Sequence, residues 1–236
     1  VDIFTVAKNG GVYHAWNRAP IVNRKWNEWT RIDDAFQVPP GSPLSALSHA
    51  DGIIELFVVH SDQKVRRQRV PVGSLAGIFA EFNWVPIGGD GRTFAVKTPI
   101  TAVDVMGYTL LFAFDQKVEV VSTRRVTANA AAPFDEWFRI NMTQPPARNS
   151  PPGIIIKRSD SPQAPFRVFF AHIDKTIYGA IGKGAFDHDS WLYDSDASGT
   201  GSNLVEWWEA RWFKYSGLEV AFDAPITGLS LSNFHN

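Results

Sequence analysis

The fold follows from one stretch near the start of the chain, Asp2-Ile3-Phe4-Thr5-Val6-Ala7-Lys8-Asn9-Gly10-Gly11-Val12-Tyr13-His14-Ala15-Trp16. Two runs rich in strand-forming residues flank the segment Lys8-Asn9-Gly10-Gly11. Asn and Gly tolerate positive φ, which the tight turns between antiparallel strands require, so Asn-Gly between two such runs is a strong hairpin signal. The stretch therefore predicts a β-hairpin.

Weaker copies of this hairpin recur along the chain at spacings of roughly 53, 55 and 58 residues. Counterparts of its first strand are Glu55-Leu56-Phe57-Val58-Val59-His60, Leu110-Leu111-Phe112-Ala113-Phe114 and Val168-Phe169-Phe170-Ala171-His172. Counterparts of its second strand begin at Lys64, Lys117 and Thr176. Repetition at a fixed period is typical of repeat architectures, in which each period is one supersecondary unit.

Each hairpin is followed by a strand that carries tryptophan and then by a fourth, apolar strand. The tryptophans are Trp29, Trp84, Trp137 and Trp212, and the fourth strands begin at Pro43, Pro99, Gly153 and Pro225. Equivalent positions in every unit favour a packing role for these tryptophans, between adjacent sheets.

The two ends of the chain complement each other. The segment Pro225-Ile226-Thr227-Gly228-Leu229-Ser230-Leu231 has no hairpin after it, and the first hairpin has no strand before it. Joining the ends completes a unit, which is how a β-propeller closes without leaving a long free sheet edge. We therefore predict an all-β chain, residues 1–236 forming a single β-propeller domain of four blades that is closed by its N- and C-terminal strands. Five blades is the alternative, because residues 184–210 either form an insertion, which we favour, or contain a degenerate fifth blade.

Composition excludes several classes of function. The net charge of −1 and the scattered basic residues give no footprint for nucleic acid. The chain has no cysteine, and the sequence shows no metal-spaced histidine cluster, so we expect neither a disulfide nor a metal site, and no cofactor. No apolar run approaches the roughly 20 residues that span a bilayer, so we expect no membrane partner. The compartment, secreted or cytoplasmic, and the oligomeric state stay open.

The first unit resembles the repeat of β-propeller lectins of the Photorhabdus-lectin type, which are fucose-binding propellers related in shape to sialidases. The resemblance rests on Asp2-Ile3-Phe4, the Asn9-Gly10 turn, Val12-Tyr13-His14-Ala15-Trp16 and the pair Trp26 and Trp29. It implies that sugars bind in shallow pockets between blades, packed on tryptophan and tyrosine. The other units keep the strand pattern but not the signature: the positions of Tyr13, His14 and Trp16 correspond to Arg66, Arg67 and Arg69 in the second and to Glu119, Val120 and Ser122 in the third, while Tyr178 alone survives in the fourth.

The residues of the first unit independently suit a sugar. Tyr13 and Ala15 face one side of their strand, and His14 and Trp16 face the other. An aromatic platform beside a polar edge matches a pyranose, whose C–H face is apolar and whose hydroxyls need partners. The alternative is that Trp16 packs between blades and that His14 is a satisfied core group. We also count Trp26 as a candidate ligand-binding residue.

A short basic strand and a tryptophan-rich segment supply the remaining candidates. Arg67, with Arg66 and Arg69, could hold an anionic ligand, although we expect mainly a solvated edge strand. Trp191, Trp207 and Trp208, in the 184–210 insertion, could extend a sugar site or line an aromatic pocket.

Two enzyme classes are the alternatives to a binding protein. Asp2, Glu55 and Asp104 could serve as the paired carboxylates of a glycoside hydrolase. An aromatic pocket could instead shape an apolar substrate for a cyclisation or pericyclic reaction. We expect a glycan-binding propeller without catalytic activity.

Overall fold

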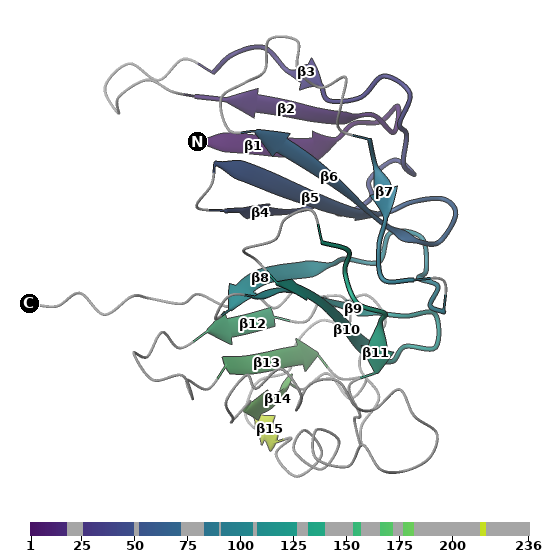
Figure 1. Ribbon diagram of the computed structural model, residues 1–236, viewed down its shortest axis with the longest axis vertical. Coiled ribbons are helices and arrows are strands. Elements are labelled where there is room, and N and C mark those ends of the chain that lie inside the picture. The colour runs from purple at the N-terminus through teal and green to yellow at the C-terminus, as the bar shows by residue number, and fades with distance from the viewer. Residues whose placement is uncertain are drawn as a thin grey trace, which may run out of the picture.

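The computed structural model describes eleven segments of the chain: residues 1–17, 26–49, 52–71, 83–89, 91–105, 108–126, 132–139, 153–156, 166–171, 177–181 and 213–215. Every regular element in them is a β-strand (Figure 1). No helix among the described residues could therefore cross a membrane.

The strands form four separate antiparallel sheets, which we call units 1 to 4 in chain order. Unit 1 contains β1 (Asp2–Val6), β2 (Val12–Trp16) and β3 (Thr30–Arg31). Unit 2 contains β4 (Ser45–Ser48), β5 (Ile53–Val59), β6 (Val65–Pro71) and β7 (Val85–Pro86). Unit 3 contains β8 (Thr101–Val105), β9 (Tyr108–Phe114), β10 (Val120–Val126) and β11 (Phe138–Arg139). Unit 4 contains β12 (Gly153–Ile156), β13 (Phe166–Ala171), β14 (Ile177–Ile181) and β15 (Phe213–Tyr215).

The predicted hairpins are confirmed, and the first opens the chain. β1 pairs with β2 from Asp2↔Trp16 to Val6↔Val12. The turns that close the first three hairpins share one backbone feature, a residue with positive φ, at Gly10 (79°), Gln63 (65°) and Val118 (64°). Only the first of these is glycine, which explains why the Asn-Gly signal is clear in unit 1 and lost in the next two units.

Pairing registers fix which residues correspond between units. Val6 pairs with Val12, Val59 with Val65 and Phe114 with Val120. Counted from these pairs, the positions of Tyr13, His14 and Trp16 correspond in unit 3 to Val121, Ser122 and Arg124. The correspondence expected from the sequence, Glu119, Val120 and Ser122, is therefore wrong, because Lys117-Val118 lies in the turn before β10, whereas the similar Lys64-Val65 leads directly into β6.

The hydrophobic core lies between units, where neighbouring sheets face each other. One cluster joins units 1 and 2 through residues such as Val12, Ile32, Leu56 and Trp84. A second joins units 2 and 3 through residues such as Phe57, Leu111, Phe134 and Trp137. β5 supplies both clusters from its two faces, so six of its seven residues are buried.

Two of the repeated tryptophans confirm the predicted packing role. Trp84 stacks on Phe36 of unit 1, with ring centroids 4.2 Å apart. Trp137 packs edge-on against Phe94, at 4.9 Å, and covers the bare backbone of Gly88, whose φ is 75°. Each tryptophan thus closes its unit against the loop that follows the preceding unit. Trp29, at the equivalent position of unit 1, is 51% exposed, and Trp212 lies outside the described residues.

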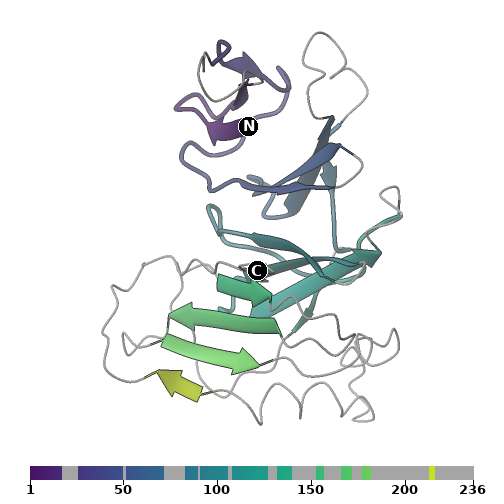
Figure 2. The same ribbon diagram turned by 90° about the vertical axis from the view of Figure 1, so that its left-hand side faces the viewer.

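The four units follow one another in an arc, with unit 1 and unit 4 at opposite ends (Figures 1 and 2). β4 lies against β8 and β8 against β12, so these first strands line the inner side of the arc. In the described part of the chain, unit 1 has three strands and lacks such a first strand, as the sequence predicted. The segment 225–231 that would supply it, and the 184–210 insertion, lie outside the described residues, so closure of a four-bladed ring is not confirmed.

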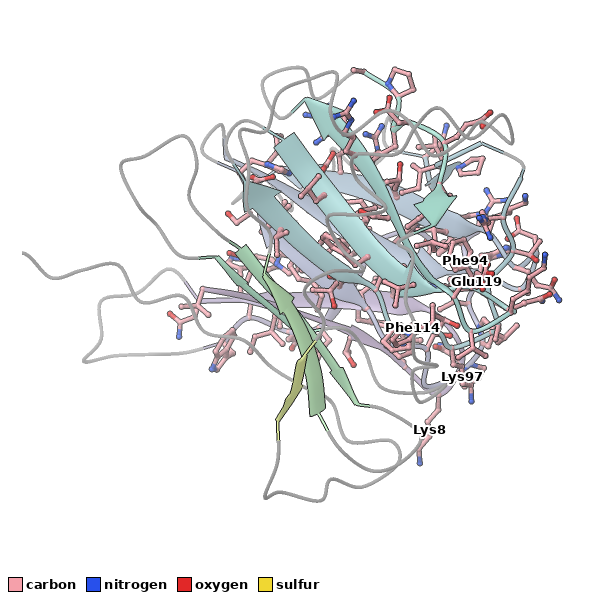
Figure 3. The ribbon with its side chains drawn as sticks, turned by 90° about the horizontal axis from the view of Figure 1, so that it is seen from below. Lys8, Phe94, Lys97, Phe114 and Glu119 are labelled. Carbon is pink, nitrogen blue, oxygen red and sulfur yellow. The ribbon has the colours of Figure 1, made fainter. Side chains whose placement is uncertain are left out.

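At the turn end of the units, buried aromatic rings lie beside charged side chains. Phe94 and Phe114 lie close to the sheets, whereas Lys8 and Lys97 project outward (Figure 3). Arg92 there donates to Asp115 and Glu119 at 2.8 and 2.9 Å and ties unit 3 to the loop before it. The polar groups that suit a ligand lie at the other end.

Candidate functional site

Units 1 and 2 present corresponding side chains at the end of each hairpin away from its turn. The pairs Asp2↔Trp16 and Glu55↔Arg69 are equivalent, and so are Phe4↔His14 and Phe57↔Arg67. In each unit these side chains face the next unit along the chain. The same place in two successive interfaces is therefore filled by different chemistry, and we describe the two places as the aromatic site and the cationic cluster.

The aromatic site consists of Asp2, Phe4, His14 and Trp16, on the face of unit 1 that packs against unit 2. His14 lies between the other two rings, 4.5 Å from Phe4 with planes 8° apart and 5.3 Å from Trp16 with planes 27° apart. Its Nε2 is 2.9 Å from Oδ1 of Asp2. Since His14 is only 1% exposed, it is enclosed within this stack and fixes the orientation of Trp16 from behind.

Trp16 is partly exposed at the outer end of the stack. Its backbone N–H donates to the side-chain oxygen of Asn27, and its carbonyl accepts from the Asn27 N–H at 3.2 Å. Trp26, which precedes Asn27 in the sequence, is 45% exposed. Tyr13 lies on the opposite face of β2, where its hydroxyl accepts from Asn9 at 3.1 Å. Tyr13 and Trp16 therefore lie on opposite faces of β2.

The cationic cluster lies between units 2 and 3 and is organised around the fully buried carboxylate of Glu55. Arg125 of β10 donates to it bidentately, with both N–O distances 2.7 Å. Arg67 and Arg69 of β6 approach the same Oε1 at 3.5 and 3.8 Å. Three guanidinium groups therefore converge on one carboxylate.

His49 joins this carboxylate to a second one. Its Nε2 is 3.0 Å from Oε2 of Glu55, and its Nδ1 is 2.9 Å from Oδ2 of Asp104. A neutral imidazole has one N–H and can donate to only one of them, whereas the imidazolium donates to both. The hydroxyl of Thr109 donates to the other oxygen of Asp104 at 2.8 Å.

An aromatic ring supports two of the guanidinium groups. The Cζ atoms of Arg125 and Arg67 lie 5.0 and 5.7 Å from the centre of the buried Phe134 ring. Cations over an aromatic face at these distances are attracted by its quadrupole. Phe134 thereby helps to orient Arg67.

Burial and like charge together act on Arg67. Burial lowers the pKa of its guanidinium, Glu55 opposes this effect, and repulsion by Arg125 and Arg69 adds to it. The balance is a lowered pKa, and burial is its largest cause.

The sequence located part of these sites. Arg67 was predicted as a candidate, but the expected solvated edge is wrong, because β6 lies inside its sheet between β5 and β7 and the Arg67 side chain is 12% exposed. Arg69 was predicted beside Arg67 in the basic strand that could hold an anion, whereas Arg125 and His49 were not predicted. The signal for Arg69 was present, since residues two apart on a strand share a face; Arg125 and His49 come from other strands and loops. Trp191, Trp207 and Trp208 lie outside the described residues.

The three carboxylates proposed for a hydrolase do not lie together at one site. Asp2 belongs to the aromatic site with His14, whereas Glu55 and Asp104 share His49 in the cationic cluster. Both oxygens of Glu55 are engaged by guanidinium or imidazole nitrogens. Within the described segments, no group of three His, Cys, Asp or Glu side chains could hold a metal ion.

Comparison with known proteins shows the fold. No protein-family model matches the chain, and no curated protein sequence matches it. Among solved structures it is similar to the BP39L lectin from Burkholderia pseudomallei, with a TM-score of 0.56 and 20% identity over 78% of this chain and 49% of that one. It is also similar to the SapL1 lectin in complex with α-methyl fucoside, with a TM-score of 0.53 and 14% identity over 95% of this chain and 60% of that one.

A third similar structure describes its own architecture. The lectin of Aleuria aurantia has a six-bladed β-propeller fold with a fucose recognition mode, and matches with a TM-score of 0.51 and 10% identity over 95% of this chain and 57% of that one. The four sheets are thus blades of a β-propeller. The chain spans about half to three fifths of the length of these lectins.

Proposed function

We propose that this chain is a glycan-binding propeller lectin without catalytic activity, and that the aromatic site between units 1 and 2 holds the sugar. The observation that carries the proposal is the stacked array of Phe4, His14 and Trp16, whose last ring is partly exposed. The similar lectins support it, since SapL1 was solved with a fucoside and the Aleuria lectin is described by its fucose recognition. Fucosides are therefore the first ligands to test.

The arrangement suits a pyranose because it is rigid before the ligand arrives. The hydrogen bond from His14 to Asp2 and the two ring stacks hold Trp16 in place, so binding orders few side chains. The apolar face of the sugar would pack on the Trp16 indole, and Asn27 and Asp2 offer polar atoms nearby. His14 acts here by positioning Trp16, since it is itself enclosed.

The exposed Trp26 would extend this platform along the edge of unit 1. Trp191, Trp207 and Trp208 remain part of the proposal as a second set of aromatic contacts contributed by the 184–210 insertion. Tyr13, on the opposite face of β2, would contact a ligand only in the interface on the other side of unit 1.

A glycan array with the purified protein and two matched variants tests the proposal. We expect binding to a subset of glycans, fucosides among them, and a loss of about tenfold or more in Trp16→Ala, since an aromatic contact of this kind is worth about 1.4 kcal/mol. Trp29→Ala is the control, because it removes an equally large and 51% exposed tryptophan from the same unit.

Two results would count against the proposal. A blank array from a protein that is folded by circular dichroism would reject glycan binding. Equal losses in Trp16→Ala and Trp29→Ala would reject the aromatic site as the place of binding. Turnover of an apolar substrate would instead favour the enzyme alternative.

A further inference from the structure

The cationic cluster brings three guanidinium groups to one buried carboxylate. Arg67, Arg69 and Arg125 approach Glu55, and His49 lies between Glu55 and Asp104. A buried or half-buried excess charge is costly unless a counter-charge is supplied. The lowered pKa of Arg67 has part of its cause in this crowding of cations.

The Glu55 carboxylate already accepts hydrogen bonds, and the three arginines share them unevenly. Arg125 occupies both oxygens of Glu55 at 2.7 Å. The ion pair of Arg69 with Glu55 is much longer, at 3.8 Å, and the buried Nε of Arg69 has no hydrogen-bond partner among the described residues. Arg69 is thus close enough to be fixed by the field of Glu55 but lacks the short hydrogen bonds that guanidinium groups normally make when buried.

The members of the cluster differ in exposure, and the Asp104 side chain is 31% exposed. The side chains of Glu55 and Arg125 are fully buried. Those of Arg67 and Arg69 are 12% and 25% exposed. Arg67 and Arg69 are therefore partly accessible over the sealed carboxylate of Glu55, so an external anion can reach these two guanidinium groups without displacing Glu55.

We propose that Arg67 and Arg69, at the interface of units 2 and 3, bind an oxyanion, a carboxylate or sulfate group. The planar fork of a guanidinium matches two oxygens of such a group, and Phe134 holds the plane of Arg67. The oxyanion would complete the hydrogen bonding of Arg69 and add a negative charge beside the three guanidinium groups. The oxyanion is either part of an acidic sugar or a free ion in solution. Assigning it to a sugar rests on the proposed function, whereas the oxyanion site itself does not depend on that function.

This site differs in specificity from the aromatic site, although the two occupy equivalent positions. His14 and Trp16 stand where Arg67 and Arg69 stand in unit 2. Across the interface, the register places Ile54 and Val70 of unit 2 where unit 3 has Thr109 and Arg125. One interface thus offers an apolar ring surface and the next offers cations, so a single propeller would select a neutral sugar at one position and an acidic group at another.

Isothermal titration calorimetry with three probes tests the inference: glucuronate, methyl glucoside and inorganic sulfate. We expect glucuronate to bind, methyl glucoside to bind at least about tenfold more weakly, and binding to weaken as sodium chloride is raised. Sulfate binding equal to that of glucuronate would support the oxyanion site and assign it to free anions. Equal binding of glucuronate and methyl glucoside, or no binding of either anion, would overturn the inference.

Two matched variants locate the site. Arg69→Gln should weaken glucuronate binding by about tenfold or more, since hydrogen bonds to charged groups are worth about 1.5–3 kcal/mol. Arg66→Gln should leave it unchanged, because Arg66 lies on the opposite face of β6 and pairs with Asp62. Equal loss in both would overturn the inference. Arg69→Lys, which keeps the charge but not the fork, should give an intermediate loss, and it serves if Arg69→Gln does not fold.

The two proposals can fail separately. A blank glycan array with intact glucuronate binding would reject the aromatic sugar site and keep the oxyanion site. Binding of neutral glycans with no response to glucuronate or sulfate would reject the oxyanion site alone.

Discussion

Gly88→Ala is the substitution that most directly measures how the units pack on one another. Gly88 follows β7 of unit 2, and its φ of 75° suits glycine. A Cβ built at this position overlaps the indole of Trp137, which belongs to unit 3. The main chain also joins the two residues, since the Trp137 N–H donates to the Gly88 carbonyl at 3.3 Å.

Two costs follow from this geometry. A positive φ costs an alanine about 1 kcal/mol, and forcing a methyl group into a filled contact costs a further 1–3 kcal/mol, about 2 at the centre of that range. Gly41 isolates the first cost, because its φ is 76° and a Cβ there meets nothing within 4 Å. We therefore expect Gly88→Ala to lower the free energy of unfolding by about 3 kcal/mol and Gly41→Ala by about 1 kcal/mol.

Urea unfolding followed by tryptophan fluorescence and by circular dichroism measures both variants. Replacing glycine by alanine also stiffens the unfolded chain, which raises the free energy of unfolding. This gain is common to the two variants and cancels when their free energies of unfolding are subtracted. A difference of about 2 kcal/mol supports close packing of unit 3 on unit 2 through Trp137. A difference below about 0.5 kcal/mol would refute it.

Three further substitutions test the described interactions by the same unfolding measurement. Arg125→Met should destabilise the protein by about 3 kcal/mol or more, because it removes the bidentate partner of the buried Glu55. Adding Glu55→Leu should recover much of this loss, and no recovery would contradict the pairing of the two residues. Phe36→Ala should cost about 2–3 kcal/mol through the lost stack on Trp84, and a neutral effect would show that unit 1 does not depend on this contact. Val118→Gly should stabilise by about 1 kcal/mol, since a β-branched residue at a φ of 64° is strained, and destabilisation would contradict the strain.

The sequence predicted the repeated hairpins because each combines alternating strand patterns with a turn. It also predicted the packing role of Trp84 and Trp137, since their places recur in each unit. The register of unit 3 differs from the prediction because β10 begins at Val120, two residues beyond Val118, whereas β6 begins at the valine of the similar Lys64-Val65 dipeptide. Local propensity does not reveal a conformation that the surrounding strands impose.

The cationic cluster shows the limit of reasoning along one chain. Glu55, Arg67 and Arg69 can be placed on one face from their alternation along the paired strands β5 and β6. That Arg125 enters the same site depends on how unit 3 docks on unit 2, a contact between residues 70 positions apart. The sequence therefore suggested an exposed basic strand, and the docking of the sheets turns it into a largely buried cluster.

A structure of the protein bound to the tightest glycan found on the array tests the central claim most directly. The account predicts a sugar ring packed on the indole of Trp16, between units 1 and 2, with the His14 ring unmoved behind it. A glycan bound only elsewhere, with Trp16 untouched, would contradict the account.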